Sequence, residues 1–402
     1  MSLSKNQLII LSVVGFVVIV FAVIIFTGLG LRADRESASL SLWGVDDRDV
    51  FEPIINDFNK DYPNVKISYD QIPEENYEQS LIDALAAGNG PDIFMFRSDW
   101  MRKHMNKVIS APEDILSAGR FGSLFPQVAV QDFVSGNAVY ASPLYVDTLA
   151  LYYNRNIFDR KNIAIPPNTW EGFKNAISRG VAASFGGYAP LVAHSGDIMN
   201  ALFMQANADL SLQNKSFVRL SEDAGITALN LYTSVKAPVV ETYAGFANET
   251  LGMIIDYESA RKIIQDRNPF LNFSVAMLPQ LDTGSPVVPA KYYGLAVSTK
   301  SVSPTLAWEF VSYVTTNASA AESYLNASNH PPALRSFIQS YSGDPIFGVF
   351  AAQALIARSW NMPASENVFT IFNTMIQSVV SGGASVKSAL TTAETAINNL
   401  VR

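Results

Sequence analysis

Acidic and aromatic side chains gather where the predicted strands end in the first part of the chain. Trp43 ends a short alternating strand and Asp47 follows it, and Arg97, Asp99 and Trp100 follow the apolar run DIFMF. Open parallel sheets bind ligands at the carboxyl ends of their strands, so these residues are candidates for ligand contact. Carboxylate and guanidinium groups bind paired hydroxyls, and aromatic rings cover an apolar face at low entropy cost. The pattern favours a polar ligand that also has an apolar face.

The sequence carries no motif typical of a hydrolase or of a nucleotide-binding enzyme. A GxSxG elbow, an HExxH pair and a P-loop are all absent. There is no cysteine, and the three histidines, His104, His194 and His330, are scattered without the spacing that would place two on one helix face. We therefore expect no catalysis, no cofactor and no metal.

Hydrophobic periodicity predicts a β-α-β-α-β unit before residue 97. Strands are expected at 40–43, 65–70 and 92–96, with helices at 46–62 and 77–87 between them. This order implies right-handed crossovers and an α/β fold with an open parallel sheet between helices.

The rest of the chain predicts a second α/β unit and a helical tail. Helices are expected to begin at four capping residues, Thr169, Asp197, Ser221 and Ser303. Strands are predicted in LGMIID, FSVAMLP and YYGLAVS, and three helices near 345–357, 366–379 and 384–401.

Length and charge limit the possible functions. A chain of 402 residues exceeds the size at which one core stops growing, which favours two lobes. The net charge of −8 disfavours nucleic-acid binding, because such binding depends on clustered lysine and arginine.

The N-terminus contains a long apolar segment. Residues 8–31 form 24 positions without a charged side chain, enough to cross about 30 Å of hydrocarbon. The apolar core of a secretory signal is shorter, about 7 to 15 residues, so we expect an uncleaved membrane anchor with the remaining chain outside the cytoplasm. The absence of cysteine leaves no site for an N-terminal lipid anchor.

The order of these fragments resembles a known family. LWGVDDRDVFEPIINDFNKDYPNVKI, LAAGNGPDIFMF, SPLYVDTLALYYNRNIFDR, PPNTWEGF, FANETLGMIID and PTLAWEFVSYV are similar to segments of the extracellular solute-binding proteins of ABC transporters, in the sugar-binding group that includes maltose-binding protein. The resemblance extends from about residue 40 to the C-terminus. It implies a two-lobed, type II periplasmic-binding-protein-like fold, a saccharide in the cleft, ABC permease subunits as partners, and a monomer.

The resemblance also divides the chain. Residues 1–36 would be anchor and spacer, 37–146 lobe 1, 147–288 lobe 2, 289–340 the return to lobe 1, and 341–402 helices that complete the lobes. The stretch Ser142–Asn154 would be the first crossover, an extended hinge segment between lobes that move as bodies.

Ligand-binding residues are carried over from the resemblance by position. They are Trp43, Asp47, Arg97, Asp99, Tyr145, Asp147, Tyr257, Glu258, Tyr293 and Trp360.

Several of these residues also have structural interpretations. Asp46 or Asp47 could cap a helix, and Asp147 could form an ion pair with Arg155 or another neighbour. Tyr293 could pack between the lobes. Trp100 stands where maltose binders carry an arginine, which makes maltose itself doubtful as the ligand, and a lone tryptophan there could start a helix and pack in the core.

Two alternative functions use the same fold or the same acids. Adjacent tyrosines, in LYYN and KYYG, could bind ferric ion if their pKa values were strongly lowered. Asp47, Asp99, Asp147 and Glu258 could supply the two carboxylates of an anchored glycoside hydrolase.

Overall fold

The computed structural model describes residues 37–184, 195–210, 218–235, 242–282, 284–360 and 362–401. The predicted membrane segment, residues 8–31, lies outside these ranges. Within them, no helix is both long enough and apolar enough to cross a membrane.

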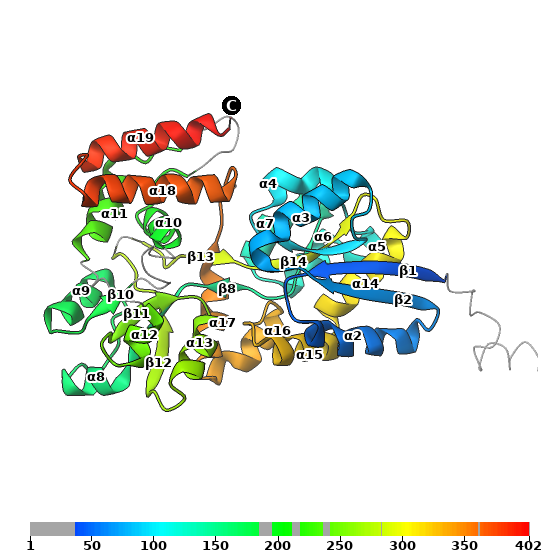
Figure 1. Cartoon of the computed structure of the whole chain (residues 1–402), viewed down its shortest axis with the longest axis horizontal. Helices are drawn as coiled ribbons and strands as arrows, with labels where there is room; N and C mark the ends of the chain where they lie inside the picture. Colours follow the sequence, from blue (N-terminus) through cyan, green and yellow to red (C-terminus); the bar gives the residue numbers. More distant parts are fainter. Residues whose placement is uncertain are drawn as a thin grey trace, which may run out of the picture.

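Lobe 1 is built on a six-stranded sheet whose order is β2-β1-β3-β14-β4, with β7 paired to β14. Strand β1 is parallel to β2 and β3, as predicted, whereas β14 runs antiparallel to β3. The arrowhead of β1 points toward the second lobe (Figure 1), so the carboxyl ends of the parallel strands face that lobe. The strands are β1 (Ala38–Gly44), β2 (Val65–Gln71), β3 (Ile93–Arg97), β4 (Val108–Ile109), β7 (Ser142–Pro143) and β14 (Tyr293–Ser298).

Helices cover this sheet because their apolar residues recur on one side. In α2 (Arg48–Asp61), Phe51, Ile54 and Phe58 are buried, and the helix ends before Pro63, as predicted. Helix α3 (Glu74–Ala87) ends at Gly88, whose φ of 78° is favourable for glycine. The other helices of lobe 1 are α4 (Met101–His104), α5 (Glu113–Leu116), α6 (Ala118–Leu124), α7 (Gln127–Phe133), α14 (Pro304–Thr316) and α15 (Ala318–Ser328), with the 3-10 turn η1 (Met105–Lys107) after α4 and the two-stranded sheet of β5 (Val134–Ser135) and β6 (Ala138–Val139) after α7.

Lobe 2 has its own four-stranded sheet, in the order β10-β11-β9-β12. Its strands are β9 (Ala150–Asn154), β10 (Ala183–Ser184), β11 (Met253–Asp256) and β12 (Phe273–Met277). Its helices are α8 (Arg155–Arg160), α9 (Trp170–Ser178), α10 (Ser195–Gln205), α11 (Asp223–Ser234), α12 (Thr242–Ala247), α13 (Ala260–Arg267), α18 (Ser365–Val380) and α19 (Val386–Asn399).

A small sheet joins the two lobes. It consists of β8 (Asp147–Thr148), β13 (Val288–Lys291) and β15 (Ala357–Arg358), in the order β15-β13-β8. These strands lie between the lobes (Figure 1), and we call them the hinge sheet. Helix α16 (Arg335–Ser340), the turn η3 (Tyr341–Gly343) and α17 (Phe347–Ile356) form another connection between the lobes.

The stretch Ser142–Asn154 contributes to three sheets in succession. Its β7 pairs with β14 in lobe 1, its β8 pairs with β13 in the hinge sheet, and its β9 pairs with β11 and β12 in lobe 2. The expected extended crossover is therefore three short strands. The lobe boundaries predicted from the sequence stay predictions.

The predicted helix starts are only partly correct. Thr169 caps α9, because its side chain accepts a hydrogen bond from the Gly172 amide. Asp197 lies inside α10 rather than before it, and the residue before α11 is Glu222 instead of Ser221. Ser303 precedes α14, but its side chain makes no capping hydrogen bond. Neighbouring polar residues offer alternative start points, which is why composition alone misplaced two of them.

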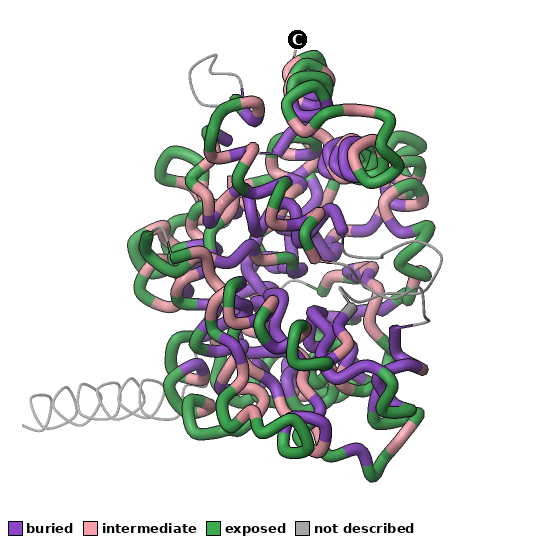
Figure 2. The backbone as a smooth tube through the Cα atoms, turned by 90° about the vertical axis from the view of Figure 1, so that its left-hand side faces the viewer, coloured by how far each residue is buried: buried purple, intermediate pink, exposed green. Residues whose placement is uncertain are grey.

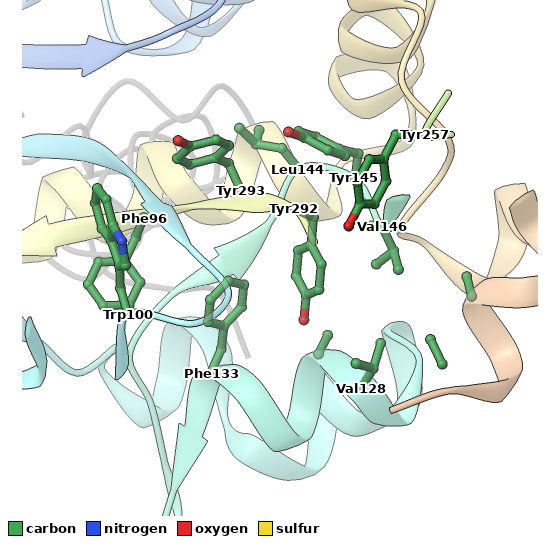
Figure 3. Packing of buried hydrophobic residues seen from close by; sticks show 14 of the residues in the cluster. Phe96, Trp100, Val128, Phe133, Leu144, Tyr145, Val146, Tyr257, Tyr292 and Tyr293 are labelled. Carbon is green, nitrogen blue, oxygen red and sulfur yellow. The ribbon is translucent and has the colours of Figure 1, made fainter. Parts of the chain in front are cut away.

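Buried aromatic side chains pack together where lobe 1 meets the hinge sheet (Figure 3). Tyr292 and Tyr293 are adjacent in sequence and point to opposite sides of their strand (Figure 3). Tyr292 packs against Phe133, and Tyr293 packs edge-on against Trp100. Buried residues fill the interior of both lobes, and exposed residues lie on the outer helices (Figure 2).

Gly294 is required by the close approach of two strands. A Cβ at this position would lie 2.6 Å from the carbonyl oxygen of Ser142 in the paired strand β7. We expect Gly294→Ala to lower the free energy of unfolding by about 2 kcal/mol through overpacking, as measured by urea denaturation. Gly119→Ala in α6 is the matched control, because its Cβ meets nothing within 4 Å. Equal stability of the two variants would contradict the tight packing.

Candidate ligand-binding cleft

Two neighbouring cavities, which share several lining residues, lie beside the hinge sheet. The inner cavity, of about 50 Å³, takes its walls from both lobes and from the hinge. Lobe 1 contributes Ser98, Asp99 and Asp132; lobe 2 contributes Asp197, Asn200, Tyr257 and Phe369; and the connecting segments contribute Pro289, Ala290, Lys291, Arg358, Ser359, Trp360 and Met362.

The outer cavity is larger, about 490 Å³, and extends along lobe 1. It shares Ser98, Asp99, Asp132, Ser359, Trp360 and Met362 with the inner cavity. Its other walls are Met101, Arg102, Met105, Gln131, Val134, Ser135 and Gly136. The two cavities are therefore adjacent, with the shared residues lying between or along both.

Three of the predicted site residues line the inner cavity. Asp99 follows β3, Tyr257 follows β11, and Trp360 follows β15. The indole nitrogen of Trp360 donates to Asn200 Oδ1 at 2.9 Å, which fixes the ring against α10. Aromatic walls beside carboxylates and an amide suit a ligand with hydroxyls and an apolar face.

Asp132 is a cavity residue that the sequence analysis missed. It lies in α7, is 8% exposed, and lines both cavities. Its carboxylate accepts hydrogen bonds from the hydroxyls of Tyr292, at 2.6 Å, and Ser359. Burial raises the pKa of Asp132 to about 7. An acid on the buried face of an otherwise apolar helix was the signal that could have identified it.

Arg97 does not line either cavity, but it connects the lobes beside them. Its Nε donates to Asp99 Oδ1 at 2.6 Å within lobe 1. Its Nη2 donates to Ser365 Oγ at 3.1 Å and to the Glu366 carboxylate, both at the start of α18 in lobe 2. Lys103 lies 4.0 Å from the same glutamate. Arg97 therefore joins a cavity acid of one lobe to a helix of the other.

Trp100 packs in the core of lobe 1, as its structural interpretation predicted. It is 2% exposed, stacks on Tyr77 and lies directly before α4.

Trp43 is half-buried on β1 and packs against the core of lobe 1. Asp47 is exposed before α2, where it accepts from Gln71 and makes no capping hydrogen bond. Neither Trp43 nor Asp47 lines the two cavities, so their contact with ligand stays a prediction.

Tyr145 and Tyr293 also lie outside the lining of these two cavities. The ring of Tyr145 stacks on His330, with centroids 3.8 Å apart, and His330 lies 3.7 Å from Asp46. Tyr293 faces Arg97 across the β14–β3 pair. Both rings are buried, and their contact with ligand stays a prediction.

Asp147 and Glu258 form a buried acidic pair at the hinge. Asp147 accepts hydrogen bonds from the amides of Thr148, at 2.7 Å, and Glu258, at 3.2 Å. Glu258 pairs with Arg261 at 2.6 Å. Burial, and then the charge of Glu258, raise the pKa of Asp147 to about 8, and burial also raises the pKa of Glu258. These contacts tie the hinge strand to lobe 2. The expected ion pair with Arg155 is not among the contacts of Asp147, and ligand contact by either acid stays a prediction.

The tyrosine pairs proposed for iron do not converge on one point. Tyr292 bonds to Asp132, while Tyr293 lies on the other side of the strand (Figure 3). Tyr152 donates to the backbone of Tyr257, and Tyr153, its neighbour on β9, packs on Phe158. Among the residues of the described ranges, no three histidine or acidic side chains form a metal-binding group.

Comparison with protein families gives a match over most of the folded chain. Residues 45–321 match the model of the family described as bacterial extracellular solute-binding protein. A binding protein of Brucella abortus is 23% identical over 251 residues, which cover 58% of this chain and 61% of that protein. The match therefore spans about three fifths of the length of this curated relative.

Other relatives match over more of their length. The maltotriose-binding protein of Pyrococcus abyssi is 22% identical over 80% of this chain and 72% of its own. Among solved structures, the sugar-binding protein MalE of Xanthomonas citri superposes with a TM-score of 0.79, at 17% identity, over 90% of this chain and 97% of that one. At this identity the superposition establishes the two-lobed α/β fold.

Proposed function

Because this chain belongs to the family of bacterial extracellular solute-binding proteins, we propose that it captures a saccharide between its two lobes and delivers it to an ABC permease. The observation that carries this proposal is the inner cavity. Its walls combine carboxylates, an amide and aromatic rings, and they come from both lobes. A ligand that reaches into this cavity contacts both lobes at once.

The relatives support a saccharide as the ligand class. The Pyrococcus relative is described as binding maltotriose and the Xanthomonas protein as binding sugar. Family members and structural neighbours are binding proteins rather than enzymes, which agrees with the absence of catalytic motifs in the sequence.

The proposed mechanism is capture by closure. Contacts to Asp99 on lobe 1 and to Asn200 on lobe 2 would form together only when the lobes are closed. A ligand shifts the equilibrium by the difference in its affinity for the open and closed forms. Rotation would be absorbed by the short strands of the hinge sheet, because hinges are a few residues at the ends of elements.

We further propose that residues 8–31 anchor the protein, as a monomer, on the outer side of the cell membrane. The apolar length of this segment supports that placement. An anchor would raise the effective concentration of the receptor near its permease.

The proposal is tested by thermal melting of the full chain in lipid nanodiscs against maltose, maltotriose, raffinose, sorbitol, spermidine and ferric citrate. A ligand at about 100 times its Kd should stabilise the folded state by about 2.7 kcal/mol. A shift with one or more saccharides supports the proposal. A shift of the melting temperature with spermidine or ferric citrate alone would show that the ligand is not a saccharide. No shift with any compound would contradict saccharide capture.

The bridge from Arg97 to Glu366 should favour closure. We expect Glu366→Gln to weaken saccharide binding by about 2- to 5-fold, because the exposed glutamate contributes roughly 0.5 to 1 kcal/mol to the closed form. The loss should shrink in 0.5 M NaCl, as measured by calorimetric titration. Glu171→Gln on α9 is the control, since its pair with Lys174 lies within one helix. A salt-independent loss would argue against the ionic bridge.

A further inference from the structure

His330 lies where lobe 1 meets the crossover between the lobes. It follows α15 directly, because Asn329, with a left-handed φ of 60°, ends that helix. The ring of Tyr145 in the crossover stacks on the imidazole, and the backbones of Tyr145 and Pro332 form an isolated antiparallel bridge. In the residues that the structure describes, the buried Nδ1 of His330 has no hydrogen-bond partner, so no hydrogen bond there fixes the proton on the ring. The end of a helix is a favourable place for a positive charge.

Carboxylates from three parts of the molecule act on this imidazole. Asp46, in the loop after β1 of lobe 1, lies 3.7 Å from Nε2 and accepts a hydrogen bond from the Tyr324 hydroxyl at 2.7 Å. Asp147 belongs to hinge strand β8 and Glu258 follows β11 of lobe 2, and the charges of both act on His330. The ionisable groups that contact or act on the ring are Asp46, Tyr145, Asp147, Glu258 and Tyr324.

The cations of this region have other contacts. Arg261 of α13 pairs with Glu258 at 2.6 Å. Lys291 is opposite Asp147 in the hinge sheet, but its amine lies over the ring of Tyr257. Protonation of the imidazole therefore adds a positive charge among these carboxylates.

The surroundings of the ring determine how its charge depends on pH. Burial lowers the pKa of His330, but the contact with Asp46 and the charges of Asp46, Asp147 and Glu258 outweigh burial and raise this pKa above its ordinary value. A raised pKa means that proton binding stabilises the assembled cluster. This contribution is present at low pH and is lost as the pH rises through the raised pKa. Asp147, whose pKa is raised to about 8, also loses its proton as the pH rises and adds a further negative charge.

The cluster spans parts of the molecule that move relative to one another. His330 lies beside Asp46 in lobe 1, whereas Glu258 belongs to lobe 2. Arg97 and Glu366 bridge the lobes in this structure, so the cluster is that of lobes in contact. Rotation at the hinge sheet changes the distance from the imidazole to the acids of the hinge and of lobe 2. A charged ring attracts those acids, and a neutral ring leaves the carboxylates of the two lobes to repel one another.

We propose that protonation of His330 favours closure of the lobes, so that the saccharide is bound more tightly at acidic pH and released as the pH rises. This inference rests on the proposed saccharide function and names a regulation of the same site. The imidazolium holds the acids of lobe 1, the hinge and lobe 2 together, and its loss of a proton favours the open form.

Calorimetric titration at pH 6 and pH 8.5 tests the inference, with the full chain in nanodiscs and the saccharide that gives the largest melting shift. We expect the Kd to rise about 5-fold or more between the two pH values, because the closed form binds the proton more tightly. Asp132 lines the cavities and has a pKa of about 7, so the wild-type ratio alone does not identify the group.

Two histidine variants identify the group. In His330→Gln, the ratio of the Kd at pH 8.5 to that at pH 6 should fall to about one third of the wild-type ratio or less. His104→Gln is the matched control and should keep the wild-type ratio, because His104 pairs with Glu78 within lobe 1. The same ratio in a folded His330→Gln variant as in the wild type would overturn the inference and leave saccharide capture intact. No saccharide binding at either pH would overturn the proposed function, and this inference with it.

The titration of the imidazole itself decides the inference even if His330→Gln fails to fold. The chain has three histidines, so ¹³C-histidine labelling gives few ring signals, and His104→Gln and His194→Gln assign the other two. A saturating saccharide should raise the pKa of His330 by about 0.7, which is the same 5-fold factor, because coupling between two ligands is reciprocal. A His330 titration that the bound saccharide does not change would overturn the inference.

Discussion

Replacing Trp360 by alanine is expected to weaken saccharide binding by at least 30-fold, about 2 kcal/mol, the effect typical of a central aromatic contact. Trp360 lines both cavities and is held by its hydrogen bond to Asn200. The substitution removes a stacking surface and leaves the Asn200 amide without this donor. Calorimetric titration with the saccharide that gives the largest melting shift measures the effect.

Two further variants separate the loss of ring stacking on the ligand from a nonspecific effect of removing an aromatic side chain. Trp360→Phe keeps a ring but loses the indole donor, so we expect it to recover much of the affinity. Phe270→Ala removes a ring that is 95% exposed on lobe 2 and should bind like the wild type. Normal affinity in Trp360→Ala would remove this residue from the site.

The second large effect concerns the buried carboxyl of Asp147. Because its pKa is raised in the folded protein to about 8, the folded state retains a proton that the unfolded state releases above its ordinary pKa near 4. Stability from this group is therefore fully present only at low pH, and it is lost as the pH rises toward 8. The slope is about 1.4 kcal/mol per pH unit while only the folded state is protonated.

Asp147→Asn removes the titration and retains an acceptor for the Thr148 and Glu258 amides. We expect the variant to gain stability relative to the wild type as the pH rises from about 5 to about 8, by at least about 2 kcal/mol in total. Urea denaturation at several pH values measures this difference. A difference that does not change with pH would show that Asp147 is ionised in the folded protein throughout that range.

Single helices and strands could be predicted because the spacing of apolar residues within a short stretch of sequence indicates them. The alternation in LSLW and the spacing of Phe51, Ile54 and Phe58 located β1 and α2 correctly. Resemblance then supplied the two-lobed architecture and placed Asp99, Tyr257 and Trp360, which line the inner cavity.

The rest of the site depends on contacts that the sequence does not encode locally. Arg97 meets Glu366 across 269 positions, and Asp132 meets Ser359 across 227. Such pairs form only when lobe 1 meets the segments that follow hinge strand β15, namely Ser359 and the start of α18. A strand end has both a cleft side and a core side, and the sequence does not show which side Trp43 takes. Its ring packs against the core of lobe 1, and its contact with ligand stays a prediction.

The central claim is that a saccharide binds in the cleft beside Trp360. Indole N–H signals of ¹⁵N-tryptophan-labelled protein test it directly, with the Trp360 signal assigned from Trp360→Phe. Trp170 and Trp308 are buried within the lobes, where they donate to Gln205 and Ile109, and they serve as internal references. We predict that a saturating saccharide shifts the Trp360 signal and leaves the two references unchanged. A saturated titration in which the Trp360 signal does not move would contradict binding in this cleft.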